Sequence, residues 1–324
     1  MPRMMNVLIV RTSSMGDLIH TWPALTDLAR HVPDLEITWL AEENFADIAR
    51  LHPAVGEVIP MAWRRWRKNL FASATWDEMN LLKNRLQTTD WDVVVDAQGL
   101  LKSALPAWLA KGPVVGYNWR SIREPVASLL YSRKFDVSRN LSAVDRNRQL
   151  FARIFGYTLT DKADFGILCG ERPGWLPMRG YAVLLHATSR HSKEWPEEHW
   201  IGCGKQLFTR KGLISVIPWG NTKERARAER LAAALPDAVA APRLGLAEAA
   251  GLLGHADAVI GVDTGLSHLA NALDVPLVAI YTDTDPAKTG VIETPFAVNL
   301  GGIGRLPSVE EVLDALDQRK GIAG

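Results

Sequence analysis

Short apolar runs rich in β-forming residues alternate with helical patterns along the chain, and this alternation occurs in two rounds. The first round runs from Asn6–Arg11 to Val114–Tyr117, and the second runs from Tyr181–His186 to Leu277–Tyr281. Strands that alternate with helices are typical of βαβ units, whose strands pair in parallel. The sequence therefore predicts an α/β protein with two parallel sheets. We expect further strands at Glu36–Leu40, Glu57–Met61, Asp92–Asp96, Ile214–Pro218 and Ala258–Val262, and helices at Leu18–His31, Met79–Gln87, Ser142–Phe155 and Val309–Gln318.

The stretch between the two rounds is rich in glycine and proline, which mark loops. A chain of 324 residues is long enough for two domains of about 150 residues each. We therefore expect Rossmann-like domains at residues 1–156 and 181–324, joined by a linker at residues 157–180. Open sheets of this kind bind ligands at the carboxyl ends of their strands. Two of them facing across a cleft form the GT-B arrangement, which is the predicted fold.

Composition excludes several classes of protein. The 37 basic and 36 acidic residues almost cancel, so nucleic acid is not an expected partner. Cys169 and Cys203 are too few for a disulfide framework or a zinc cluster. No segment approaches the ~20 apolar residues of a membrane-spanning helix, and a cytoplasmic location is expected.

The first expected strand is followed by Thr12-Ser13-Ser14-Met15-Gly16-Asp17, which contains a single glycine. The G-x-G-x-x-G fingerprint of a dinucleotide site is therefore absent. Asp17 falls in the first turn of the next helix. Its carboxylate either caps this helix or acts as a general base that takes a proton from an attacking hydroxyl group.

Two segments of the second round are suited to an anionic ligand. Thr188 and Ser189 supply hydroxyl groups just after a strand, and Lys193 supplies a positive charge that could offset the charge of a departing diphosphate. In the other segment, Asp263 ends a buried strand, and the backbone amides of the following residues could form an anion site at a helix N-terminus. The alternative is that these are turn, capping and solvated loop residues. The residues that follow Asp263 in this segment are Thr264, Gly265, Leu266, Ser267 and His268.

A D-x-D triplet, Asp283-Thr284-Asp285, offers carboxylates that could hold a divalent cation. Such short patterns recur by chance, and Lys193 with the helix amides could neutralise a diphosphate without a metal ion. We expect no metal site and no cofactor.

One segment contains a dense cluster of basic residues with tryptophans beside and between them. It is either the solvated start of a helix or a docking site for an anionic, membrane-held acceptor. Its cationic residues are Arg64, Arg65, Arg67 and Lys68, and Arg123 could extend it.

Taken in order over nearly the whole chain, these segments resemble the bacterial lipopolysaccharide heptosyltransferases, most closely the branch that adds the first heptose to the inner core. The matching segments are Arg11–Asp17, Arg64–Lys68, Asp96–Leu100, Arg123–Pro125, His186–Thr188, Lys193–Pro196, Pro218–Gly220 and Asp263–His268. The chain departs from the family after its last expected strand, where Thr282-Asp283 replaces the usual Gly-Pro or Gly-Ala pair.

The resemblance implies an inverting, metal-independent transfer of heptose from ADP-L-glycero-β-D-manno-heptose to a Kdo sugar of Kdo-lipid A, at the cytoplasmic face of the inner membrane. It implies that Asp17 is the base, that Lys193 contacts the donor phosphates and that Leu244 lies near the adenine. The other implied donor ligands are Thr188, Ser189, Glu224, Asp263, Thr264, Gly265 and His268. The alternatives are a GT-B transferase or an epimerase that uses another nucleotide sugar, and a non-catalytic module that binds anionic lipid.

Overall fold

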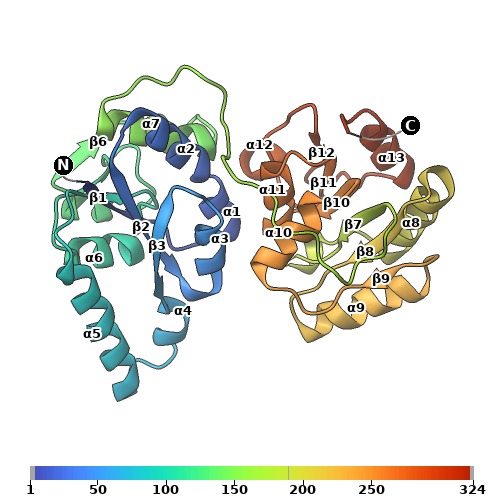
Figure 1. Ribbon diagram of the computed structural model, residues 1–324, viewed down its shortest axis with the longest axis horizontal. Coiled ribbons are helices and arrows are strands. Elements are labelled where there is room, and N and C mark those ends of the chain that lie inside the picture. The colour runs from blue at the N-terminus through green and yellow to red at the C-terminus, as the bar shows by residue number, and fades with distance from the viewer. Residues whose placement is uncertain (1–3, 189, 322–324) are drawn as a thin grey trace. The chain divides into compact units, whose positions relative to one another are not determined.

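The chain divides into two compact units, Met1–Ile167 and Leu168–Gly324 (Figure 1). The computed structural model describes residues 4–188 and 190–321. Each unit is built around one six-stranded sheet, and each neighbouring pair of strands in these sheets runs parallel. The two parallel sheets predicted from the sequence are therefore present.

Unit 1 has the strand order β3-β2-β1-β4-β5-β6. Its central strand β1 is a run of apolar residues in which Val7 to Val10 are fully buried, as expected of a parallel strand covered on both faces. Helices α2 and α7 lie side by side, joined by a buried ion pair between Arg148 and Asp27 at 2.7 Å (Figure 1). The elements of unit 1 are β1 (Met5–Val10), α1 (Met15–Ile19), α2 (Trp22–His31), β2 (Leu35–Glu42), η1 (Glu43–Phe45), α3 (Ala46–Arg50), β3 (Val55–Met61), α4 (Trp63–Trp66), α5 (Ser73–Thr88), β4 (Val93–Asp96), α6 (Leu101–Leu109), β5 (Val114–Tyr117), η2 (Pro125–Leu130), β6 (Arg133–Phe135) and α7 (Ala143–Phe155).

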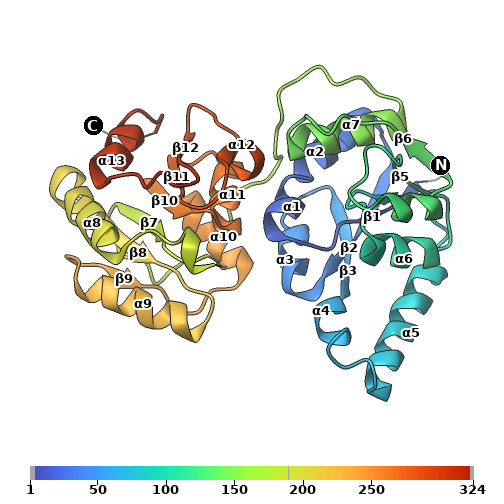
Figure 2. The same ribbon diagram turned by 180° about the vertical axis from the view of Figure 1, so that it is seen from behind.

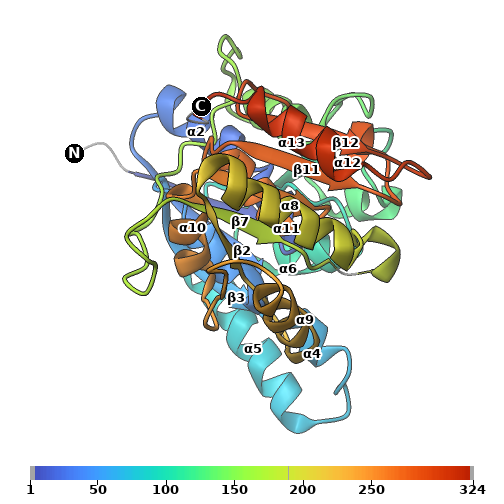
Figure 3. The ribbon, with the colours of Figure 1, turned by 90° about the vertical axis from the view of Figure 1, so that its right-hand side faces the viewer.

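Unit 2 has the strand order β12-β11-β10-β7-β8-β9. Helices α8 and α13 lie side by side, and Arg210 of α8 pairs with Glu310 of the α13 segment at 2.9 Å (Figure 3). The elements of unit 2 are β7 (Tyr181–Leu185), η3 (His191–Lys193), α8 (Glu197–Lys211), β8 (Ile214–Ile217), α9 (Thr222–Ala233), β9 (Val239–Ala240), α10 (Leu246–Gly254), β10 (Ala258–Val262), α11 (Gly265–Ala272), β11 (Leu277–Tyr281), α12 (Pro286–Thr289), β12 (Ala297–Gly301) and α13 (Val309–Asp317).

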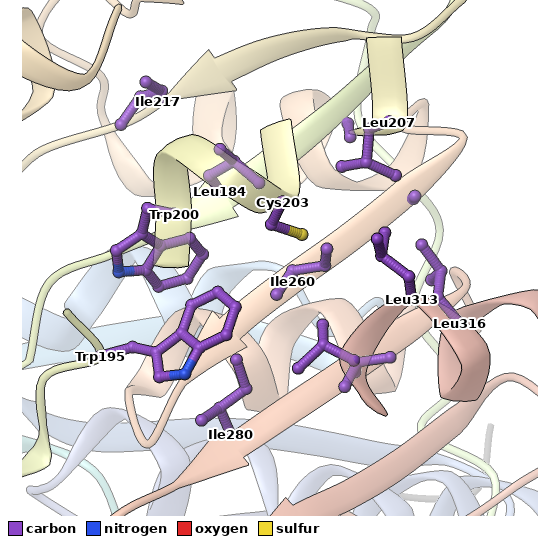
Figure 4. Close-up of a cluster of buried hydrophobic side chains, with 14 of the residues drawn as sticks. Leu184, Trp195, Trp200, Cys203, Leu207, Ile217, Ile260, Ile280, Leu313 and Leu316 are labelled. Carbon is purple, nitrogen blue, oxygen red and sulfur yellow. The ribbon is translucent and has the colours of Figure 1, made fainter. Parts of the chain in front are cut away.

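The hydrophobic core of unit 2 contains two of the tryptophans. The rings of Trp195 and Trp200 meet edge to face, with centroids 5.0 Å apart, and both side chains are fully buried (Figure 4). Side chains of α8, α13 and the central strands, among them Cys203, Ile260 and Leu316, complete the cluster. These two tryptophans therefore contribute to the core and not to a surface of the protein.

The expected helix Leu18–His31 is wrong as a single element. Helix α1 ends at Ile19 and α2 begins at Trp22. Pro23 explains the break, because in a continuous helix its ring would clash with the carbonyl group of residue 19. Three strands also escaped the sequence pattern: β6, β9 and β12 form sheet edges and have two to five residues each, so their apolar runs are too short to recognise.

Residues 157–180, the predicted linker, contain no helix or strand. They still pack against the units, since Phe165 and Leu176 are buried. Residues up to Ile167 group with unit 1, and those from Leu168 group with unit 2. Within the described ranges, no helix is both long and apolar enough to cross a membrane.

Candidate active site

In unit 1, β1 is followed by β2 and β3 on one side of the sheet, and β4 is followed by β5 and β6 on the other side. The gap between the carboxyl ends of β1 and β4 is therefore a topological switch point, where open sheets bind ligands. Hydrogen bonds link the two loops that leave this point. The amide and the hydroxyl group of Thr12 both donate to Oε1 of Gln98, at 2.8 and 2.7 Å. The guanidinium group of Arg11 donates to the carbonyl oxygen of Ala97.

Asp17 lies in the first turn of α1, next to this switch point. Its Oδ1 atom pairs with Nη2 of Arg11 at 2.8 Å, and its Oδ2 atom accepts a hydrogen bond from the amide of Ser14 at 2.9 Å. About a quarter of its side chain, 25%, remains exposed to solvent. Asp17 therefore caps the helix, as one interpretation of the sequence held, and still presents part of its carboxylate to solvent.

The environment keeps Asp17 ionised. Burial acts to raise the pKa of this carboxyl group, but the charge of Arg11, the Ser14 amide and the more distant charge of Arg123 act against burial and lower the pKa to about 2. The group is thus a carboxylate at neutral pH, which is the form that a general base requires.

A second carboxyl group, Asp96, lies fully buried at the end of β4. It accepts hydrogen bonds from the amides of Gln98 and Gly99, from the hydroxyl group of Ser103 at 3.0 Å and from that of Tyr131 at 2.5 Å. Burial raises the pKa of Asp96. Since all of these bonds point into the protein, Asp96 holds the loop that carries Gln98 in place.

The structure adds Lys102, which sequence reasoning missed. Its Nζ atom donates to the hydroxyl group of Ser13 at 2.7 Å, within the loop that leads to Asp17. Burial, and then the neighbouring charge of Arg64, lower the pKa of Lys102, and the charge of Arg123 acts in the same direction. Lys102 therefore lies among the cations predicted to bind an acceptor. The signal in the sequence is its position three residues after Gly99, directly beyond the Asp96–Leu100 segment that carries part of the family resemblance.

The basic cluster divides into residues with different surroundings. Arg65 pairs with two carboxylates, Glu43 at 3.2 Å and Glu78 at 2.8 Å. Arg64 is exposed, with its guanidinium group 5.0 Å from the ring centroid of Phe45. Arg67, Lys68 and Arg123 are also exposed. The structure thus sets Arg65 apart, because its charge is already neutralised by the protein.

The switch point of unit 2 lies between β7 and β10. Here the Nζ atom of Lys193 pairs with Oδ2 of Asp263 at 2.6 Å, and the two side chains are only 15% and 11% exposed. The hydroxyl group of Thr284 donates to the same Oδ2 atom at 2.8 Å, and that of Thr188 donates to the carbonyl oxygen of Asp263 at 2.8 Å. The structure therefore brings four residues from three loops together at the ends of β7, β10 and β11. Ser189 lies outside the described residues.

Helix α11 begins directly beside this cluster. Thr264 is its N-cap residue and Gly265 its first residue, and both are half-buried. The first amides of a helix have no partner within the helix and carry its positive dipole end, which suits an anion. His268 lies one turn further along and is 8% exposed.

Two other predicted donor ligands lie further along the same sheet edge. Glu224 is in the first turn of α9, after β8, and its two oxygens accept hydrogen bonds from the amide of Gly220 at 2.7 Å and the side chain of Asn221 at 2.6 Å. Leu244 is half-buried in the loop between β9 and α10. Glu224 follows β8 and Leu244 follows β9, and these strands lie two and three positions from β10, which precedes Asp263.

Thr282 and Asp283, which depart from the family pattern, form hydrogen bonds to the turn that carries Lys193. The hydroxyl group of Thr282 donates to the carbonyl oxygen of Ser192 at 2.8 Å, and the hydroxyl group of Ser192 donates to Asp283 at 2.6 Å. Asp285 caps α12 by accepting from the amide of Ala287 at 3.0 Å. Both carboxylates of the D-x-D triplet thus have protein partners. Among the described residues, no group of three or more histidine, cysteine, aspartate or glutamate side chains is placed to hold a metal ion.

Known proteins resemble this chain over most of its length. The model of glycosyltransferase family 9 (heptosyltransferase) matches residues 79–314. Lipopolysaccharide heptosyltransferase 1 of Pseudomonas aeruginosa is 47% identical over 288 residues, which cover 88% of this chain and 81% of that protein. The structure of E. coli heptosyltransferase WaaC with ADP matches with a TM-score of 0.89 at 40% identity, covering 97% of this chain and 99% of the other. The same enzyme with ADP-2-deoxy-2-fluoro heptose matches with a TM-score of 0.86 at 39% identity and the same coverage.

These similarities extend over both units, so they concern the fold as a whole and not a shared motif. The predicted fold class, an α/β protein with two Rossmann-like domains of the GT-B kind, is confirmed, as is the family resemblance. The chain is a glycosyltransferase and belongs to glycosyltransferase family 9, the heptosyltransferases.

Proposed function

We propose that this enzyme transfers L-glycero-D-manno-heptose from ADP-L-glycero-β-D-manno-heptose to a Kdo residue of Kdo-lipid A, with inversion at the anomeric carbon. The observation that carries the proposal is the pair of switch-point sites: an ionised, partly exposed Asp17 in unit 1, and the Lys193–Asp263 cluster beside the N-terminus of α11 in unit 2. The names of the relatives support the choice of heptose and of lipopolysaccharide.

In this mechanism, unit 2 binds the donor and unit 1 binds the acceptor. A Kdo hydroxyl oxygen attacks the anomeric carbon as the bond from that carbon to the diphosphate oxygen breaks, and Asp17 takes the hydroxyl proton. Lys193 and the first amides of α11 stabilise the negative charge that develops on the departing ADP. Thr188, Ser189 and His268 are further proposed donor ligands, with Glu224 for sugar hydroxyl groups and Leu244 beside the adenine.

The direct test is mass spectrometry of Kdo-lipid A after incubation with the protein and ADP-heptose. We expect the mass of one heptose to be added to the acceptor, and no addition when UDP- or GDP-sugars replace the donor. Addition of a different sugar, or none with any donor, would contradict the proposed function.

The transfer should continue in the presence of excess EDTA. The reason is that Lys193 and the α11 amides are proposed to neutralise the diphosphate, while Asp283 and Asp285 already hold protein partners. Initial rates measured with and without the chelator should agree within about twofold. If chelation abolished transfer and Mg²⁺ or Mn²⁺ restored it, the metal-free mechanism would be wrong.

Arg64 and Arg65 should differ in their effect on the acceptor. Arg64→Ala removes an exposed cation near Lys102, and losing one charged contact of about 1–2 kcal/mol should raise the acceptor KM roughly tenfold at low salt. Arg65→Ala should change the acceptor KM much less, because Glu43 and Glu78 already neutralise the charge of Arg65. Equal effects of the two substitutions would mean that the cluster acts as a diffuse charge. The donor KM is the internal control for both variants.

We also propose peripheral contact with an anionic membrane through the loop between α4 and α5, which projects from unit 1 (Figures 1 and 2). Phe71 at this loop is fully exposed, and the exposed cations Arg67 and Lys68 precede it. Aromatic side chains next to cations suit the interface of an anionic bilayer.

Phe71→Ser should therefore weaken binding to anionic vesicles roughly ten- to hundredfold in a sedimentation assay, which corresponds to the loss of about 1.5–3 kcal/mol of apolar burial. Leu168→Ser is the matched control, because Leu168 is an exposed apolar residue of unit 2. Equal binding by both variants would exclude the loop as the contact.

A further inference from the structure

A cavity of about 250 Å³ lies in unit 1 between α4, α5 and α6. Its walls are almost entirely apolar and include Trp63 and Trp66 of α4, Met79 and Leu82 of α5, and Leu105 and Trp108 of α6. Helices α5 and α6 pack against each other beside it (Figure 2). Sites for whole small molecules commonly have ~300–1,000 Å³ and several polar groups, so this cavity suits a narrower, apolar ligand.

The cavity opens to solvent through apolar side chains. Leu105 is 48% exposed and Trp108 is 59% exposed, although both line the cavity. Single exposed apolar residues are common on proteins, but a contiguous apolar opening over a cavity marks a binding surface.

Lys102 connects the cavity to the candidate active site. Its side chain lines the cavity, while its Nζ atom bonds to Ser13 at 2.7 Å, and the charges of Arg64 and Arg123 act on it. One of the two cations that line the cavity, Lys102, therefore lies beside the loop that leads to Asp17, whereas the other, Lys83, belongs to α5. This juxtaposition is complementary to an amphiphile with an anionic head and a hydrocarbon chain. It favours a chain that belongs to the acceptor itself over one from a separate bilayer lipid, because Lys102 of the cavity wall lies within electrostatic reach of Arg64 and Arg123, which are predicted to bind the acceptor head.

We propose that this cavity binds a fatty acyl chain of the lipid acceptor while the sugar head of the same molecule is held near Lys102 and Asp17. This proposal rests on the proposed function, since it specifies how that acceptor is recognised. The chain would contribute to affinity through apolar burial, at a site distinct from the membrane-contact loop.

The test compares two acceptors with the same Kdo and phosphate groups: the fully acylated lipid in mixed micelles at fixed detergent, and the same head group with all acyl chains removed. We expect the parent enzyme to show a lower KM for the acylated acceptor. Leu105→Gln makes the cavity wall polar without changing charge, and Met79→Trp fills the cavity. Each should reduce the preference for the acylated acceptor roughly tenfold or more, because a polar or filled cavity can no longer bury several methylene groups of the chain.

Leu81→Gln is the matched control, because Leu81 lies on α5 next to Leu82 but is 68% exposed and does not line the cavity. It should keep the preference of the parent. The proposal is overturned if the two cavity variants keep that preference, or if all three variants lose it equally, which would indicate partition into the micelle. Product from neither acceptor would instead refute the proposed function.

Discussion

Asp17→Asn is expected to lower turnover by a factor on the order of one hundred or more, with the donor KM nearly unchanged. A general base commonly contributes about 10²–10⁴-fold, and asparagine cannot accept the proton. The substitution keeps an oxygen that can accept from the Ser14 amide, so α1 should stay capped and circular dichroism should match the parent. Near-normal turnover with an intact fold would remove Asp17 from the mechanism.

The low pKa of Asp17 is compatible with this role. A carboxylate with a pKa of about 2 is a weak base, but the hydroxyl group becomes strongly acidic once its oxygen bonds to the anomeric carbon. Proton transfer can therefore follow bond formation, and the base only needs to be ionised and in reach. The rate of the parent enzyme should then show no acid limb from Asp17 between pH 8 and 5.

Stability gives an independent check of that pKa. Because the folded state lowers the pKa from 3.8 to about 2, the ionised carboxylate stabilises the fold above pH 3.8, and this contribution is lost as the pH falls towards 2. The difference in free energy of unfolding between the parent and Asp17→Asn should narrow over that range. A difference that stays constant with pH would mean that the pKa is not lowered.

Lys193→Met is expected to reduce turnover by about 10²–10³-fold and to weaken donor binding. Losing one group that stabilises developing negative charge typically has a kinetic effect of this size. The substitution also leaves Asp263 nearly buried without its cation, which should lower the free energy of unfolding by up to about 3–5 kcal/mol. Stability and activity would then fall together, so a second variant is needed.

The double variant Lys193→Met/Asp263→Asn separates the two effects. It removes the unpaired charge and should recover much of the thermal stability, whereas turnover should stay low because the cation is still missing. Recovery of both would mean that Lys193 only supports the fold. Lys205→Met, an exposed lysine of α8, is the matched control and should behave as the parent.

The sequence by itself determined the architecture and the chemistry of the loops. Continuous apolar strands such as Val7–Val10 and Ala258–Val262 must be buried on both faces, so they define the two parallel sheets without knowledge of any contact. Because such sheets bind ligands at the carboxyl ends of their strands, Asp17 and Asp263 could be selected from the residues that follow those strands.

Only the tertiary structure decided which side chains meet. The Lys193–Asp263 pair joins residues 70 positions apart, and Lys102 reaches a serine 89 positions away. Likewise, Arg65 looks equivalent to Arg64 in the sequence and is distinguished only by carboxylates from η1 and α5. The cavity between α4, α5 and α6 has no sequence signature at all, because its lining is an ordinary set of apolar helix residues. Local patterns encode burial and the succession of strands and helices along the chain, whereas side-chain pairing and cavities depend on how separate elements pack.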